Sequence, residues 1–486
     1  MLMCITTQIK IANTVCTNFV AKFTGDRADP NTSLKPDITF LSKNNPVNLR
    51  KDFDKASPMT SFQNMELFVE LKHETQCDPF QDETTAAVDF TIERSSINGD
   101  NTRGQCTLYA TNQLAYQHRL FAFSLVICGK RARFLRWDRE GVIVSAGIDC
   151  STNHNLVIEF LQRFNQMTPE QRGLDPTATP ATPEEIEAFE SVVANVEIES
   201  LKHSVGDQEA YPRFRLEIRD AHDEVSRYVV GKALDYNLGV VGRCTRGYLA
   251  LDQSTNQPVF LKDMWRPDVQ GVEPEHIWYE KLTVASVPHL VKVKHGSDVI
   301  QSTSTSTLDY YGTAPPKSTE TTSRQGAQRG LTHRLASFFD SRETKLRGYV
   351  HYRLVQTELC RPLSEFTNSK HLVSVALDSL KGWDTRPCFD STSDILGHVA
   401  CVSAFSDAGL FHRDVSLGNI MIGPDNEGRL NDWDLCRGVS VENSLEGPRT
   451  VRGRFRTPVP ELSLFCRERG SSYRPGYLSA PARSTH

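Results

Sequence analysis

Residues 410–422 read LFHRDVSLGNIMI, and residues 430–438 read LNDWDLCRG. The first stretch contains His-Arg-Asp, with the aspartate at position 414, and Asn419 follows after four intervening residues. An apolar segment typical of a helix precedes this stretch, and the triplet IMI is typical of a short strand. Asp432 stands 18 positions beyond Asp414 (432 minus 414). Two short stretches therefore supply three side chains with oxygen atoms that can bind a proton or a metal ion.

This spacing matches HRDxxxxN, the catalytic loop of protein kinases. Phosphoryl transfer from ATP needs a carboxylate that accepts the hydroxyl proton, and oxygen ligands that hold Mg²⁺ against the phosphates. We therefore expect Asp414 to be the catalytic base, and Asn419 and Asp432 to be the Mg²⁺ ligands. The turn residues GPDNEG at 423–428 predict a β-hairpin between the two ligands.

Together with VELKH, QHRLFAF, LGVVGRCTRGY, VFLKDMWR and LCRPLSEF, these two stretches resemble the fungal-type protein kinase family. The resemblance extends from about Met65 to Glu461. It implies an α+β, bilobal protein-kinase-like fold with a small β-rich lobe and a helical large lobe. It also implies that ATP and Mg²⁺ are the cofactors and that Ser/Thr hydroxyls of a protein substrate receive the γ-phosphate.

The resemblance also assigns residues of the nucleotide site. Lys262 in VFLKD matches the strand lysine that contacts the α- and β-phosphates. Gly242 and Gly247 occupy the outer positions of GxGxxG, whereas Cys244 replaces the middle glycine that would let the backbone approach a phosphate closely.

Two further assignments concern the partner of Lys262 and the adenine site. The helix expected over EPEHIWYEKL offers Glu275 as the partner of Lys262 and Glu280 as the alternative. The hinge that would bind the adenine edge is expected in VQTELCRPL, where Glu358 and Cys360 offer backbone groups.

Along the chain we expect five segments. They are an extended polar arm (1–55), an accessory α/β domain (56–185), the kinase small lobe (205–297), a low-complexity Ser/Thr-rich insert (298–332) and a C-terminally incomplete large lobe (333–486). A Pro/Thr-rich linker or exposed loop, LDPTATPATPEE, is expected between the accessory domain and the small lobe. The large lobe is expected to be incomplete because few residues follow the PE motif of the activation segment.

Composition limits the classes of protein further. The 486 residues are 38% hydrophobic and 24% charged and carry a net charge of −5, which describes a soluble globular chain and favours neither nucleic acid nor a membrane as partner. The twelve cysteines include no CxxC pair and no signal peptide is evident, so we expect an intracellular protein with reduced thiols. The oligomeric state is left open.

Three alternatives stay open. The chain could be a pseudokinase or truncated nucleotide-binding protein without turnover, or a phosphotransferase acting on small molecules such as aminoglycosides or choline. Glu70 and Lys72 also form the ExK pair of PD-(D/E)xK nucleases, in which carboxylates bind a metal and a lysine orients water. The required first acidic residue has no assignment in the sequence, so a structural role is favoured for this pair.

Overall fold

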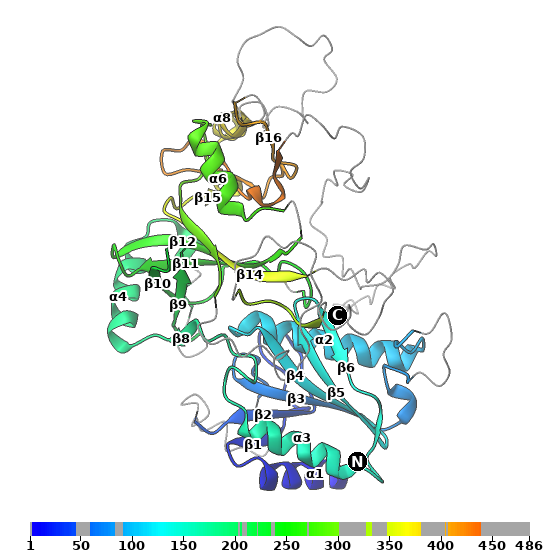
Figure 1. Ribbon diagram of the computed structural model, residues 1–486. Helices are drawn as coiled ribbons and strands as arrows, with labels where there is room; N and C mark the ends of the chain where they lie inside the picture. The colour runs from blue at the N-terminus through cyan, green and yellow to red at the C-terminus, as the bar shows by residue number, and fades with distance from the viewer. Residues whose placement is uncertain are drawn as a thin grey trace, which may run out of the picture. The chain divides into compact units, whose positions relative to one another are not determined.

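The computed structural model describes most of the chain outside its C-terminal end. The described residues are 2–44, 59–82, 91–202, 205–206, 211–220, 222–234, 239–269, 272–300, 327–332, 348–380, 404 and 407–438. Within them the fold is mixed α/β with several sheets, which is consistent with a kinase-like fold (Figure 1).

The first sheet lies in the N-terminal part of the chain and has seven strands. These are β1 (Phe19–Phe23), β2 (Ile38–Ser42), β3 (Met65–Lys72), β4 (Phe121–Cys128), β5 (Arg131–Asp138), β6 (Gly141–Val144) and β7 (Ile148–Asp149). Their order is β1-β2-β3-β4-β5-β6, and β7 pairs with β5. All pairs are antiparallel except β3 with β4, which α2 (Ile97–Tyr116) connects after the short 3₁₀ helix η2 (Thr75–Cys77). Because a parallel pair needs a crossover connection, α2 takes that role.

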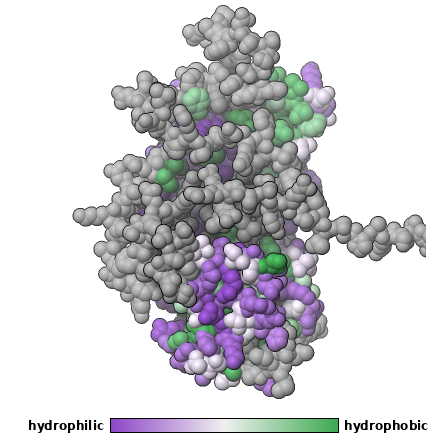
Figure 2. Space-filling view, turned by 90° about the vertical axis from the view of Figure 1, so that its right-hand side faces the viewer, coloured by the Kyte–Doolittle hydropathy of each residue, from purple (hydrophilic) through white to green (hydrophobic). Residues whose placement is uncertain are grey.

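Helices cover both faces of this sheet (Figure 1). α1 (Leu2–Val15) and α3 (His154–Gln166) share a core with β1, and α2 packs on the other face with Phe68, Cys106 and Tyr109 buried between. The Ser96 hydroxyl starts α2 by accepting a hydrogen bond from the Gly99 N–H at 3.1 Å. Figure 2 shows mainly hydrophilic residues on the outward face of this part of the molecule. Among the described helices, none combines the length and the apolar character needed to cross a membrane.

The expected polar arm over residues 1–55 is wrong for the described part of that range. Residues 2–44 form α1, β1 and β2, and β2 pairs with β3. The polar, turn-rich residues between β1 and β2 suggested an extended segment, but they form only the connection between these two strands. The strands themselves are short runs, FVAKF and ITFLS, and Phe19, Ala21, Ile38 and Phe40 are buried in a core that they share with α1 and α3.

The second sheet also has seven strands within the described residues. These are β8 (Ala178–Pro180), β9 (Phe214–Arg219), β10 (Val225–Val230), β11 (Arg246–Asp252), β12 (Gln257–Pro267), β13 (Val293–Asp298) and β14 (Tyr349–Gln356), in the order β13-β14-β12-β11-β10-β9-β8. α4 (Pro183–Ala194) and the short α5 (Glu199–Lys202) precede β9. α6 (Glu275–Val284) lies between β12 and β13 in the chain, as the helix pattern of EPEHIWYEKL predicts.

Two expected boundaries are wrong. The Pro/Thr-rich stretch near residue 180 is no linker, because β8 pairs with β9 and Thr182 and Glu185 form a capping box at the start of α4. Threonine and an edge-strand proline fit a strand as well as a loop. The small lobe does not end before the expected insert either, because β14 pairs with both β12 and β13. The part of that insert over 301–326 lies outside the described residues.

The C-terminal described residues hold short elements around the catalytic stretch. These are β15 (Arg361–Pro362), the 3₁₀ helix η4 (Leu363–Glu365), α8 (Ser369–Leu380), β16 (Leu410–Phe411), β17 (Ile420–Ile422), β18 (Gly428–Leu430), the 3₁₀ helix η5 (Trp433–Leu435) and β19 (Arg437–Gly438). β17 and β18 form the predicted hairpin. Its core side chains, with Trp433, pack with residues of α6, β14 and α8. The expected activation segment beyond 438 and most of the large lobe lie outside the described residues.

Candidate active site

A buried lysine between two carboxylates forms the centre of the site. Lys262 projects from β12, and its Nζ lies 2.8 Å from Oε2 of Glu275 at the start of α6. The same Nζ contacts Oδ1 of Asp432, which precedes η5. Lys262 and Glu275 are 7% and 1% exposed, so the cation and the glutamate are both removed from water. Residues 170 positions apart thus meet in one ion cluster.

The charges in this cluster shift one another's protonation. Burial alone would lower the pKa of Lys262, but Asp432 and Glu275 raise it above its ordinary value. Burial would raise the pKa of Asp432, but Lys262 and then Arg243 hold it below its usual range. Burial raises the pKa of Glu275 despite the attraction of Lys262. The lysine therefore stays a cation and Asp432 an anion, as phosphate and metal binding require.

The structure decides between the two glutamates that the sequence offered. Glu275 faces the sheet and uses both oxygens, since Oε2 accepts from Lys262 and Oε1 accepts the Trp433 N–H at 3.2 Å. Glu280 is exposed on the same helix. α6 is thereby tied to the strand lysine and to the metal motif through one side chain.

The predicted catalytic loop is held by hydrogen bonds of its own. His412 is fully buried, its Nε2 donates to the Asn431 carbonyl at 2.9 Å, and its Nδ1 accepts the Asp414 N–H at 3.3 Å. The Asn419 amide nitrogen donates to the Asp414 carbonyl at 2.8 Å. The Asp414 side chain is only partly buried. The backbone around Asp414 is fixed from both sides, and its carboxylate remains reachable from solvent.

Asn431 connects this loop to the rest of the site. Its Oδ1 accepts from the Tyr279 hydroxyl of α6 and from Nε2 of Gln356 at the end of β14, both at 2.7 Å. Its N–H donates to the Asn419 carbonyl at 2.9 Å. Asn431, the residue directly before Asp432, thus connects α6 and β14 through its side chain and the catalytic loop through its backbone N–H.

The predicted metal ligands have the chemistry that Mg²⁺ prefers. Asp432 offers a carboxylate of lowered pKa, and Asn419 offers an amide whose nitrogen is already used. The oxygen of that amide is therefore the atom left to face a cation. Two such oxygen donors, completed by phosphate oxygens and water, suit Mg²⁺. Asp432 also adopts a left-handed backbone, with φ 64°, which turns the chain sharply between β18 and η5.

Hydrogen bonds attach the predicted glycine loop to the turn after β5, and its role near a phosphate stays a prediction. The N–H of Gly242 donates to the Arg139 carbonyl of the first sheet at 3.0 Å, and Arg139 donates back to the Gly239 carbonyl at 3.0 Å. Gly242 has φ +107°, which only glycine adopts freely. Cys244, also with positive φ, is buried and its Sγ contacts the Gly239 carbonyl. These contacts hold this part of the loop against the first sheet.

Gly247 has a separate reason to be glycine. It lies in β11 opposite Lys262, and a Cβ atom there would come within 2.8 Å of the Phe260 ring. This position therefore reflects close packing within the second sheet as well as any role near a phosphate.

The expected hinge follows β14, and its two named side chains serve the fold. Glu358 is buried, and its carboxylate accepts from Arg429 of β18 and from the Lys292 N–H, each at 3.3 Å. Cys360 is buried next to β15, and burial raises the pKa of its thiol to about 12. These contacts join the hinge to the hairpin that carries the metal motif.

Sequence reasoning missed one contact of the metal motif. Arg243, beside Gly242, forms an ion pair with Asp434, the residue in the glycine position of the motif. The pair joins residues 191 positions apart, and only the charge of Asp434 at an unusual position hinted at a partner.

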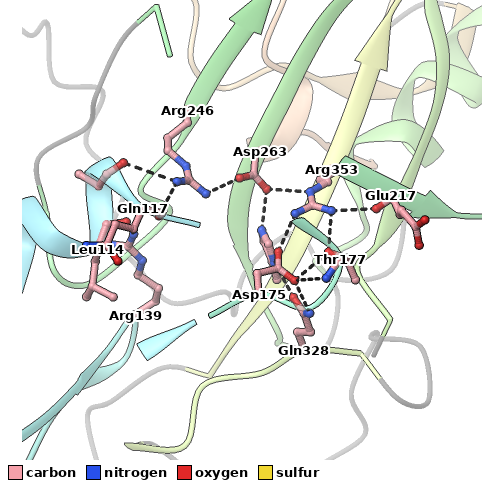
Figure 3. A network of polar contacts seen from close by, with 12 residues as sticks. Leu114, Gln117, Arg139, Asp175, Thr177, Glu217, Arg246, Asp263, Gln328 and Arg353 are labelled. Atoms are coloured by element: carbon pink, nitrogen blue, oxygen red, sulfur yellow. Dashed lines mark hydrogen bonds and ion pairs between the residues drawn. The ribbon is translucent and has the colours of Figure 1, made fainter. Parts of the chain in front are cut away.

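The opposite face of β12 carries a second charge cluster (Figure 3). Asp263, next to Lys262 in the chain, contacts Arg246, His351 and Arg353. Arg353 is fully buried and also donates to Asp175 at 2.7 Å. Arg246 further donates at 2.9 Å to the Gln117 carbonyl, directly after α2, so this cluster joins the two sheets.

A comparison with known protein families identifies the family of this chain. A family model described as fungal protein kinase matches residues 65–385. The chain belongs to the fungal protein kinase family. No curated protein matches the chain. The kinase-family match begins with β3 of the first sheet and includes Lys262, Glu275 and the expected hinge. It ends before Asp414, Asn419 and Asp432, so the resemblance noted up to Glu461 is confirmed only to residue 385.

Proposed function

We propose that this family member transfers the γ-phosphate of ATP to Ser/Thr hydroxyls of protein substrates. Family membership supports protein kinase activity in general. The observation that carries the proposed transfer from ATP is the buried contact of Lys262 with Glu275 and Asp432, next to a catalytic loop fixed through Asn431. The choice of Ser/Thr hydroxyls rests on the resemblance of the sequence alone. A cation held between a helix carboxylate and a metal-motif carboxylate is the arrangement that phosphoryl transfer from ATP uses.

In this proposal each group has one task. Lys262 exchanges its contact with Asp432 for the α- and β-phosphates, while Glu275 keeps the ammonium in place. Asp432 and Asn419 hold Mg²⁺, which neutralises phosphate charge. Asp414 accepts the proton of the attacking hydroxyl and orients it toward the phosphorus.

The test measures phosphate transfer by the full-length purified chain. With labelled Mg-ATP and a generic protein substrate, we expect incorporation into serine and threonine that is lost in Asp414→Ala. Thermal melting of each sample shows whether the fold is intact. An intact wild-type protein that transfers nothing contradicts the proposal. ATP-dependent stabilisation of that inactive protein would then identify a nucleotide-binding protein without turnover, and transfer only to an aminoglycoside or choline would identify a small-molecule kinase.

A further inference from the structure

The first sheet brings two carboxylates and a lysine together where β2 begins and β3 ends. Ile38 pairs with Val69 in this antiparallel pair of strands, and Asp37 and Glu70 are the next residues along each strand. Opposite residues on adjacent strands project from the same face. Oδ2 of Asp37 accepts the Leu71 N–H at 2.8 Å, and Nζ of Lys72 donates to Oε1 of Glu70. Asp37, directly after Pro36, thus supplies the acidic residue that the ExK pattern lacked.

One carboxylate oxygen of Glu70 has no hydrogen-bond donor among the described residues around it. Glu70 is 2% exposed, and its Oε2 is buried without a hydrogen-bond partner among the described residues. Burial, followed by the charge of Asp37, raises the pKa of Glu70 to about 7. A buried acceptor without a donor and like charges directly opposite on neighbouring strands both destabilise a fold.

A second buried glutamate of β3, Glu66, has the partners expected of a carboxylate with a purely structural role. Glu66 lies on β3 four residues before Glu70, at the irregularity in the β2–β3 register. Its Oε2 accepts from Arg119 at 2.6 Å and from Arg172 at 3.3 Å. Although burial disfavours its charge, these two arginines hold the pKa of Glu66 below its usual range. Glu70 has one lysine and an opposing carboxylate instead, so its arrangement suits a cation from solution.

The site is open to solvent on one side. Asp37 and Lys72 are only partly buried, and Lys35 is exposed two residues before Asp37. The charge of Lys35 acts on Asp37, and an exposed cation beside the carboxylates favours an anionic ligand, even though the whole chain carries a net charge of −5.

We propose that Asp37 and Glu70 hold a divalent cation and, with Lys72, hydrolyse phosphodiester bonds at a second centre that is separate from the kinase site. The water oxygen bonds to phosphorus, and the bond from phosphorus to one ester oxygen breaks. The water gives up a proton to solvent and the leaving oxygen takes one back, which yields a phosphomonoester and an alcohol. The cation neutralises the phosphate and lowers the pKa of the attacking water, and the Lys72 ammonium orients that water.

The test uses the full-length chain with Mn²⁺ or Mg²⁺ and without any nucleotide, so that failure of the kinase proposal has no effect on it. The probes are bis(p-nitrophenyl) phosphate and labelled single-stranded DNA and RNA, which separate small diesters from nucleic acids. We expect metal-dependent cleavage that EDTA abolishes and that Asp37→Asn and Glu70→Gln each reduce by about 100-fold or more. Glu74→Gln, the same substitution at an exposed position just beyond β3, leaves the rate unchanged.

Melting in EDTA separates this site from a structural ion pair. Because Asp37→Asn removes repulsion between two carboxylates, we expect the melting temperature of this variant to equal or exceed that of the wild type. Lost cleavage together with an undiminished melting temperature supports the proposal. A folded wild-type protein that cleaves none of the three probes with either metal overturns it, and so does equal cleavage by the wild type and the two variants.

Discussion

Lys262 and Asp263 are consecutive residues of β12, yet their side chains enter two opposite kinds of charge cluster. On one face a buried cation lies between two carboxylates that come from α6 and from the metal motif. On the other face a buried carboxylate lies among Arg246, His351 and Arg353. Since successive side chains of a strand alternate in direction, one β12 segment serves both clusters.

The two clusters differ in how completely the fold satisfies them. Arg353 uses its guanidinium on Asp263, Asp175, Thr177 and the Glu217 carbonyl, so every direction is occupied by protein (Figure 3). Asp432, by contrast, keeps 22% of its side chain exposed while it contacts Lys262. The Asp263 face therefore stabilises the fold, whereas the partial exposure of Asp432 supports our proposal that the Lys262 face exchanges a protein contact for a ligand.

Of the two clusters, the one around Asp263 is the fixed cluster, because protein groups satisfy it completely. The largest effect is expected when this fixed cluster loses the Asp263 carboxylate. Asp263→Asn leaves two buried arginines without their shared counter-charge, which lowers the free energy of unfolding by about 3–5 kcal/mol. Chemical denaturation of the full chain measures it. Asp223→Asn, whose side chain is 77% exposed, is the matched control and changes stability little. A loss below about 1 kcal/mol in Asp263→Asn would show that the two faces do not differ in this way.

A smaller effect, on activity, is expected from the partner of Lys262. Glu275→Gln removes a charge-assisted hydrogen bond worth about 1.5–3 kcal/mol, so kcat/KM for ATP falls roughly 10- to 100-fold. The exposed Glu280→Gln on the same helix leaves kcat/KM unchanged. Equal activity losses in both variants, with melting temperatures unchanged, would remove the distinction between the two glutamates.

Acid is expected to weaken the fixed cluster next. Although burial disfavours its charge, Arg353 and His351 lower the pKa of Asp175 from 3.8 to about 2. Because the folded pKa lies below the ordinary value, the stabilisation is complete above about pH 4 and decreases as the pH falls toward 2. Urea unfolding over this range should show a shallower pH dependence in Asp175→Asn than in the wild type. Identical slopes would mean that Asp175 is not held in its charged form by the arginine.

The smallest effect is expected at the edge of the Lys262 face. The Arg243 side chain is 33% exposed but that of Asp434 is only 7% exposed, so Arg243→Ala, which removes a partner of a buried carboxylate, costs about 1–2 kcal/mol of the free energy of unfolding. Arg227→Ala is the control, because Arg227 forms an ion pair with Glu217 and its side chain is 50% exposed. A loss of about 3 kcal/mol or more in a denaturant titration would place Arg243 with the fixed cluster instead.

Much of the local structure could be predicted from the sequence. The alternation in β9 to β12, the apolar runs of β3 and β4 and the helix pattern of α6 each follow from their own residues. The contact of Lys262 with one of two glutamates was also predictable, because a strand lysine followed by an acidic helix places them within reach. The choice of Glu275 needed the direction in which α6 faces the sheet.

The contacts between distant segments could not be predicted. Asp37 stands 33 positions before Glu70 (70 minus 37), and only the β2–β3 register places the two side chains opposite each other. Nothing in a glycine-rich stretch shows that Gly242 will bond to Arg139 of another sheet. Likewise, the polar, turn-rich residues near β1 and β2 concealed two short strands whose burial depends partly on α3, more than 100 positions further along the chain.

Calorimetric titration of Mg-ATP tests most directly whether Lys262 exchanges its protein contact for phosphate. We predict that Lys262→Met binds at least about tenfold more weakly than the wild type, because a charge-assisted hydrogen bond is lost. Lys281→Met, the same substitution at an exposed position of α6, binds as the wild type does. Equal affinity of a folded Lys262→Met protein and the wild type would contradict the account, and so would a folded wild type that does not bind Mg-ATP.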